Sequence, residues 1–171
     1  MLKKLALMMS ALLLAAIPAT SSFAVDTATT RPAPTIIDHY LKIQAALAGD
    51  AVAPIAVEAA AIATFAAQVS DKTPAADLGV ASGDTVAGRA LMPTVAAAAG
   101  KLAKAKDLKE ARTAFGELSE PMVGYRNLVT GEKPNVAYCP MAKKSWLQDG
   151  KVIANPYLGS SMLRCGNIVS K

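Results

Sequence analysis

The sequence is poor in the residues from which most enzyme active sites are built. Its 171 residues include one histidine, His39, and two cysteines. Gly-rich phosphate loops, HExxH metalloprotease motifs, CxxCH haem motifs and CxxC redox motifs are all absent. A catalytic histidine needs an orienting acid and a nucleophile beside it, and the neighbouring sequence supplies neither. We therefore interpret His39 as a structural or surface residue and expect that the protein is not an enzyme.

Long hydrophobic runs are also scarce. Residues 5–17 are apolar but too few to span a membrane, and Lys3 and Lys4 precede them. This arrangement, followed by the small residues Ser22 and Ala24, is typical of a signal peptide. We predict a signal peptide over residues 1–24, cleavage after Ala24 and a periplasmic location. No later stretch reaches membrane length without proline, glycine or charge, so we expect no membrane span after signal removal.

Features of nucleic-acid-binding proteins are missing as well. The net charge is +5, but the lysines are scattered and aromatic residues make up only 5% of the chain. The densest lysine run, over residues 101–109, has no interleaved aromatic side chains. We read it as a solvated surface and expect no nucleic-acid partner.

The part that follows the predicted signal peptide is rich in alanine, and its larger apolar residues recur at helical spacing. Residues 25–34 are small, polar and proline-rich, which indicates a flexible lead-in. Thr35 and Asp38 resemble a capping box that starts a helix ending near Gly49. Further helices are predicted over residues 51–70, over residues 84–104 and from residue 107 onward, with Pro93 and Pro121 marking kinks or breaks.

We therefore predict one domain over residues 35–171. Its fold class is all-α, an up-and-down four-helix bundle over residues 35–131. A small irregular C-terminal cap of different composition follows over residues 133–171. Within the cap, residues 136–138 and 168–169 have the composition of short strands, and Asp149 and Gly150 form a strong turn signal.

The cap contains both cysteines, each with a methionine nearby. Cys139 and Met141 are separated by one residue, and Met162 and Cys165 by two. Thiolate and thioether sulfurs are soft donors that suit Cu(I) or Ag(I) better than hard cations, and they match structural zinc poorly. If the turns fold the cap on itself, the four sulfurs meet and form a metal site. His39 or Met122 would then be able to add a ligand from the bundle.

A disulfide between Cys139 and Cys165 is the alternative. Two cysteines in an exported domain commonly form one, and this one would close a loop of about 25 residues worth about 3.5 kcal/mol. Met141 and Met162 would then be core filler. Oxidation removes the thiolates, so the disulfide and the metal site exclude each other at any one moment.

The cap resembles a family of small exported bacterial helical domains of unknown function. Members occur alone or associated with the periplasmic adaptor (membrane-fusion) subunits of copper and silver efflux pumps. The family pattern is matched by three groups of residues: Cys139-Pro140-Met141 with Trp146, Asn155-Pro156-Tyr157 with Gly159, and Met162-Leu163-Arg164-Cys165-Gly166. The resemblance implies a metal context, with an efflux adaptor or another envelope protein as partner.

These observations predict a periplasmic protein that binds or hands over Cu(I) or Ag(I) in metal efflux or tolerance. Its metal ligands would be Cys139, Met141, Met162 and Cys165, shielded by Trp146 and the turn at residues 155–157. The alternative is a disulfide-stapled, non-enzymatic interaction domain of the cell envelope without metal.

Overall fold

The structure is a computed structural model that describes residues 35–170. The predicted signal peptide at residues 1–24, its cleavage after Ala24 and the predicted lead-in at residues 25–34 lie outside the described residues. The described part contains five α-helices and three β-strands. The helices are α1 (Ile36–Ala48), α2 (Ile55–Gln68), α3 (Ala75–Leu78), α4 (Thr85–Leu102) and α5 (Leu108–Leu128). The strands are β1 (Asn135–Cys139), β2 (Lys144–Gln148) and β3 (Asn167–Ile168), and short 3-10 turns lie at Ser82–Asp84 (η1) and Gly159–Met162 (η2).

The predicted fold class, an all-α bundle with an irregular cap, is wrong. Residues of the cap form a three-stranded antiparallel sheet in the order β2-β1-β3, so the fold is mixed α/β. The strands satisfy their backbone groups by pairing, with Val136 opposite Leu147 and Ala137 opposite both Trp146 and Ile168. The pairing of β1 with β2 needs a hairpin. Its loop at residues 140–143 contains no Asn-Gly or Asp-Gly, the dipeptides that mark hairpins in a sequence, so the hairpin was not predicted. Gly150, where the turn was expected, instead follows the end of β2 with a φ of +69°.

The start of α1 follows directly from the sequence. The Thr35 hydroxyl accepts a hydrogen bond from the Asp38 N–H at 3.3 Å, and the Asp38 carboxylate accepts one from the Thr35 N–H at 2.6 Å. The predicted capping box is therefore confirmed, and Gly49 caps the other end of α1.

Two helices contain a proline that the sequence led us to expect at a kink or break. Helix α4 continues through Pro93, and α5 continues through Pro121. Neither proline ends its helix, so the expected breaks do not occur. Each costs one backbone hydrogen bond, and the buried packing of these helices, with Met92 and Leu118 fully enclosed, offsets that cost.

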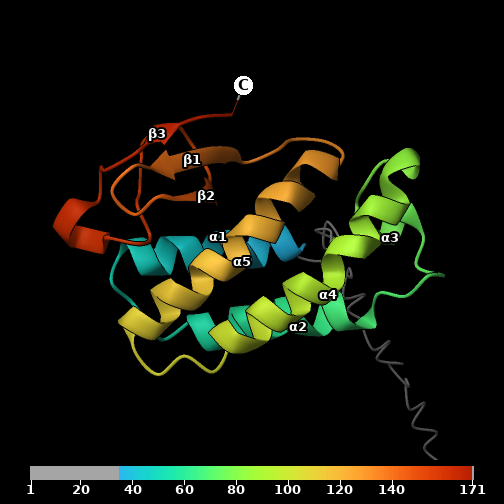
Figure 1. The fold of residues 1–171 in the computed structure, drawn as a ribbon, viewed down its shortest axis with the longest axis horizontal. Helices are drawn as coiled ribbons and strands as arrows, with labels where there is room; N and C mark the ends of the chain where they lie inside the picture. Colours follow the sequence, from blue (N-terminus) through green and yellow to red (C-terminus); the bar gives the residue numbers. More distant parts are fainter. Residues whose placement is uncertain (1–34, 171) are drawn as a thin grey trace, which may run out of the picture. The chain divides into compact units, whose positions relative to one another are not determined.

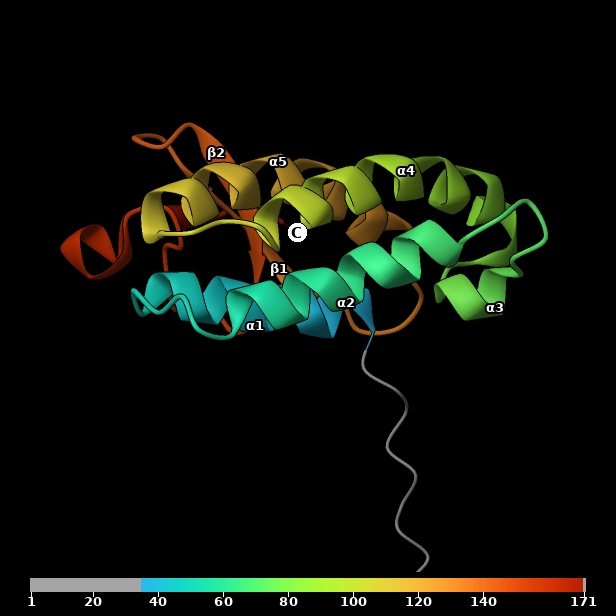
Figure 2. The ribbon, with the colours of Figure 1, turned by 90° about the horizontal axis from the view of Figure 1, so that it is seen from below.

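The sheet lies beside α1 and α5, and α2 and α4 lie on the side of these two helices that faces away from the sheet (Figure 1). Of the three strands, β2 is the one that packs against α5 and α1. Seen from below, α1 and α2 form one pair of neighbouring helices and α4 and α5 form another (Figure 2). The sheet thus extends outward from the helices, and its far strand β3 is joined to them through β1 and β2.

A ladder of aromatic rings connects the helices to the sheet. Tyr40 of α1 stacks on Phe115 of α5 at 4.9 Å between centroids, and Phe115 contacts Tyr157 at 5.7 Å. Tyr157 then meets Trp146 of β2 edge to face at 5.9 Å. Rings at these separations attract one another beyond their area burial, so the cap is fixed to the bundle rather than loosely appended.

Within residues 35–170, none of the helices combines the length and the apolar character that a membrane crossing requires.

Candidate functional site

The two cysteines meet at one end of the sheet. Cys139 is the last residue of β1, and Cys165 lies just before β3. Because Tyr138 pairs with Asn167 across these antiparallel strands, the register brings the two cysteines to the same end of the sheet. Their sulfur atoms are 3.1 Å apart, and both are free thiols. The predicted pair therefore forms in space without a disulfide bond.

The hairpin loop wraps around the sulfur of Cys139. Pro140, whose fixed φ suits the second position of a tight turn, directs the chain back so that Cys139 pairs with Lys144. The Ala142 N–H then donates a hydrogen bond to the Cys139 Sγ at 3.4 Å. Lys143 closes the loop in the left-handed region, with a φ of +52°. The sequence signal for this sulfur-binding turn is the proline directly after the cysteine.

The surroundings of the two thiols differ and move their pKa values apart. Burial disfavours the Cys139 thiolate, but hydrogen bonds from the Ala142 N–H, the Cys165 side chain and other donors outweigh burial. The pKa of Cys139 is consequently below its usual value. The hydrogen bond that Cys165 donates to Cys139, together with partial desolvation, raises the pKa of Cys165. The pair therefore favours a Cys139 thiolate that accepts a hydrogen bond from the Cys165 thiol.

A buried asparagine holds the segment that carries Cys165. The Asn155 side chain donates to the Cys165 carbonyl oxygen at 2.7 Å, and its backbone N–H donates to the Leu163 carbonyl at 2.8 Å. Its side-chain oxygen accepts from the Tyr157 N–H at 2.8 Å and the Leu158 N–H at 3.1 Å. The turn at residues 155–157 thus fixes the backbone of Cys165.

The residue after Cys165 must be a glycine. Gly166 has a φ of +136°, and a side chain there would place its Cβ 2.9 Å from the Tyr138 carbonyl oxygen and 2.8 Å from the Trp146 ring. Both neighbours are fixed, one by the β-ladder and the other by complete burial. The absence of a Cβ therefore lets the Cys165 segment approach β1 closely enough for the sulfurs to meet. Sequence reasoning noted this glycine as part of a motif but did not find its role.

The two methionines flank the pair and are not packed in the core. The Met141 side chain is 65% exposed and that of Met162 is 40% exposed. Met162 lies one turn before Cys165 and accepts the Cys165 N–H at its carbonyl oxygen, at 2.9 Å. Their expected role as core filler beside a disulfide is therefore wrong. Both thioethers are instead accessible to solvent on the segments that carry the cysteines.

The two candidate ligands from the bundle have other surroundings. The His39 Nδ1 lies 2.5 Å from the Glu58 carboxylate on α2, which Lys42 also approaches to 3.3 Å. Met122 is fully buried in α5. No cluster of three or more His, Cys, Asp or Glu side chains suited to a metal ion occurs between residues 35 and 170.

The distance of 3.1 Å between the sulfurs lies between the distances that the two predicted fates require. A disulfide needs about 2.05 Å. Two thiolates that share one ion through bonds of about 2.3 Å would lie about 3.8 Å apart at a tetrahedral angle. Either fate thus needs a relative displacement of the two sulfurs of about 1 Å or less.

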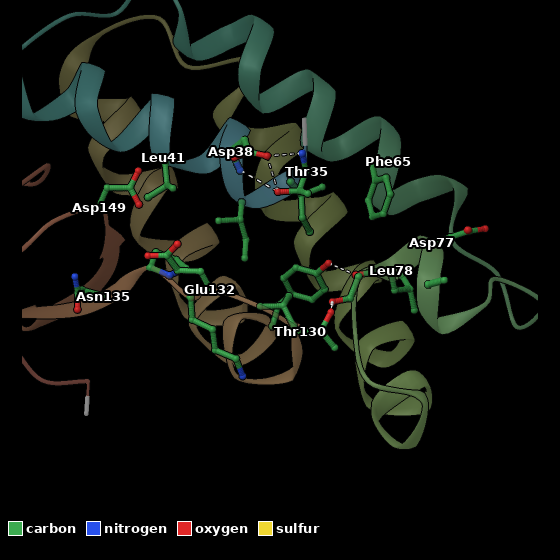
Figure 3. Close-up of a pocket in the computed structure, with 18 of the residues that line it drawn as sticks. Thr35, Asp38, Leu41, Phe65, Asp77, Leu78, Thr130, Glu132, Asn135 and Asp149 are labelled. Carbon is green, nitrogen blue, oxygen red and sulfur yellow. Dashed lines mark hydrogen bonds between the residues drawn. The ribbon is translucent and has the colours of Figure 1, made fainter. Parts of the chain in front are cut away.

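A separate pocket of about 710 Å³ lies where the start of α1 meets α3 and the chain that follows α5 (Figure 3). Its lining includes the acidic residues Asp77, Glu132 and Asp149, and Phe65 contributes apolar surface. Two of its polar lining residues already have partners, because the Tyr125 hydroxyl donates to the Leu78 carbonyl and Thr35 is engaged in the cap of α1. The four sulfur residues are not among those that line it.

Comparisons with models of protein families, with curated proteins and with solved structures found no match to this chain.

Proposed function

We propose that the protein is a periplasmic binding or handover protein for a soft monovalent cation, Cu(I) or Ag(I). The thiol pair of Cys139 and Cys165 would supply the main ligands, and Met141 and Met162 would complete the site. The observation that carries the proposal is the pair of free sulfurs 3.1 Å apart with an exposed methionine on each of the two segments. Soft sulfur donors of this kind match these ions.

Three features of the pair support metal binding. The hydrogen bonds to Cys139 favour its thiolate, and the thiolate is the form that binds metals. Asn155 and Gly166 hold the second cysteine in place through backbone contacts, so the site is preorganised. One thiolate, that of Cys139, also balances the single positive charge of the ion, which reduces the cost of holding the ion at this enclosed sulfur.

The exposed thioethers support transfer of the ion to a partner. Neutral thioethers add soft ligands without adding charge, so an ion held by one thiolate and methionines would leave more readily than one held by thiolates alone. Met141 and Met162 are solvent-accessible and would meet an approaching acceptor first. The resemblance of the cap to domains found with efflux adaptors suggests such an adaptor, or another envelope protein, as the acceptor.

The proposal is tested by anaerobic titration of the reduced protein with Cu(I) against a competing chromogenic chelator. We expect one tight site in the wild type, a loss of about a hundredfold or more in affinity for Cys139→Ser, and about tenfold for Met162→Leu. Met92→Leu is the matched control, because this methionine is fully buried in α4 and should leave affinity unchanged. A wild type that competes no better than Cys139→Ser would refute the proposal.

The close approach of the sulfurs also favours the alternative function, a disulfide-stapled interaction domain of the envelope without metal. A thiol count on protein isolated from the periplasm without reductant discriminates between the two. Two free thiols would reject a permanent staple, and no free thiols together with no Cu(I) binding after reduction would establish it.

A further inference from the structure

The two sulfurs of the pair differ sharply in access to solvent. Cys139 is 0% exposed, enclosed by the hairpin loop and by the cap. Cys165 is partly exposed, on the segment between η2 and β3. A reagent from solvent therefore reaches Cys165 but does not reach Cys139 while the protein is folded. Access also decides which thiol of a pair reacts in thiol–disulfide exchange.

We infer that Cys165 is the entry site for thiol–disulfide exchange with small disulfides of the glutathione type, and that Cys139 is the resolving thiol that completes an internal disulfide. Arg164 directly precedes Cys165, is exposed, and has one guanidinium nitrogen on the Ile153 carbonyl at 2.6 Å, so a cation next to the accessible thiol suits an anionic reagent such as glutathione disulfide. The inference depends on the proposed function only in its consequence, that oxidation removes the metal ligands and closes the metal site.

The exchange takes place in two steps. The Cys165 thiol gives its proton to the neighbouring Cys139 sulfur, and its thiolate attacks one sulfur of glutathione disulfide, so that one glutathione leaves as a thiolate and is protonated. The Cys139 sulfur, only 3.1 Å away, then loses its proton and attacks the Cys165 sulfur of the mixed disulfide. This expels the second glutathione. The two cysteines lose two electrons in total, and one glutathione disulfide becomes two glutathione molecules.

The same geometry determines the reverse reaction. A reducing thiolate attacks the accessible sulfur, that of Cys165, and the Cys139 sulfur is the leaving group. The Ala142 N–H lies 3.4 Å from that sulfur and donates a hydrogen bond to it as it leaves. The pair is thus opened and closed through one exposed atom, which makes the metal site dependent on the thiol–disulfide balance of its surroundings.

The chain has two cysteines, so each single variant keeps one identifiable thiol. Metal-free, reduced protein with a chelator present is mixed with glutathione disulfide and followed by intact mass. We expect the wild type to pass transiently through one mixed disulfide to an internal disulfide. Cys139→Ser should accumulate a stable mixed disulfide on Cys165, and Cys165→Ser should react at least about tenfold more slowly.

Denaturant provides the control for access. In denaturant the two single variants should react at similar rates, because burial no longer protects Cys139 in Cys165→Ser. Equal rates in the folded proteins, or a wild type that stops at the mixed disulfide, would overturn the inference. Because the exchange is measured without metal, it can fail while Cu(I) binding stands, and Cu(I) binding can fail while the exchange stands.

Discussion

A chain of three buried hydrogen bonds joins the sheet to the helices, and Tyr40 is its central member. The Leu147 N–H of β2 donates to the Tyr40 oxygen at 3.3 Å, and the Tyr40 hydroxyl donates to the Ser119 hydroxyl at 2.6 Å. Ser119 in turn donates to the Phe115 carbonyl at 2.8 Å. All four residues are buried, so the Tyr40→Phe variant would leave the Leu147 N–H without an acceptor in a place that water does not reach.

The expected loss follows from that unpaired donor. A buried donor deprived of its partner costs about 1–3 kcal/mol, a large part of a total stability of about 5–15 kcal/mol. The ring of Phe would still stack on Phe115 and fill the same space, so no cavity term is added. Ser119→Ala removes the acceptor of the Tyr40 hydroxyl and damages the same chain. The Tyr40→Phe/Ser119→Ala double variant should therefore lose less than the sum of the single losses, by at least about 0.5 kcal/mol.

Urea denaturation of the four proteins, followed by Trp146 fluorescence and by far-UV circular dichroism, measures these free energies. Trp146 lies in the sheet, whereas the dichroism signal comes mainly from the helices, so the two probes follow different parts of the fold. Both should report the same transition if one core joins the two parts. Single losses that add within about 0.3 kcal/mol would show that the hydrogen bonds are not coupled. In the wild type, a fluorescence transition at a lower urea concentration than the dichroism transition would show that the cap unfolds independently. That result would contradict a single core shared by the sheet and the helices.

Two further predictions concern the cap. Hydrogen bonds from the Ser160 hydroxyl, Arg112 and the Ser160 N–H lower the pKa of Asp50 from 3.8 to about 2. The stability that the ionised Asp50 contributes is therefore complete above pH 3.8, and it is lost as the pH falls through 2. Acid titration of unfolding free energy should show a smaller loss over this range in Asp50→Asn than in the wild type, and equal acid sensitivity would contradict the assignment. Gly166→Ala should cost about 1–3 kcal/mol, because its φ of +136° and the close carbonyl oxygen of β1 both oppose a side chain. Gly100→Ala in α4, whose new methyl group would meet nothing within 4 Å apart from its own helix turn, is the control and should be neutral or stabilising in the same denaturation assay.

The four long helices were accessible to sequence reasoning because their signals are local, whereas the short α3 was not predicted. The capping box at Thr35 and Asp38 and the helical spacing of apolar residues depend on contacts within a few positions. The sheet was accessible only in part: residues 136–138 and 168–169 were predicted as short strands, and they lie within β1 and overlap β3, but β2 and the pairing were not predicted. Strand β2 is five residues long, ends in a buried Gln148 and contains no β-branched residue. Its identity as a strand depends on pairing with β1 and on packing against α1 and α5.

The candidate site was predictable to the level of residue type only. The spacing of cysteines and methionines suggested that the sulfurs gather, and Cys139 and Cys165 do meet. The asymmetry of the pair was not predictable, because it arises from a hairpin loop on one cysteine and an asparagine turn on the other. The exposure of Met141 and Met162 likewise depends on how the loop and η2 project from the sheet. Sequence spacing therefore identified the candidate sulfur donors, and the tertiary fold decides which of them solvent reaches.

X-ray absorption at the copper edge of the reduced protein loaded with one equivalent of Cu(I) tests the central proposal most directly. The proposal predicts a first coordination shell made only of sulfur, with bonds of about 2.3 Å, the length of other metal–thiolate bonds. Cys139→Ser should lose at least one sulfur from that shell under the same loading. A first shell of nitrogen or oxygen donors in the wild type, or a spectrum unchanged by Cys139→Ser, would contradict the assignment of a soft-metal site to this cysteine pair.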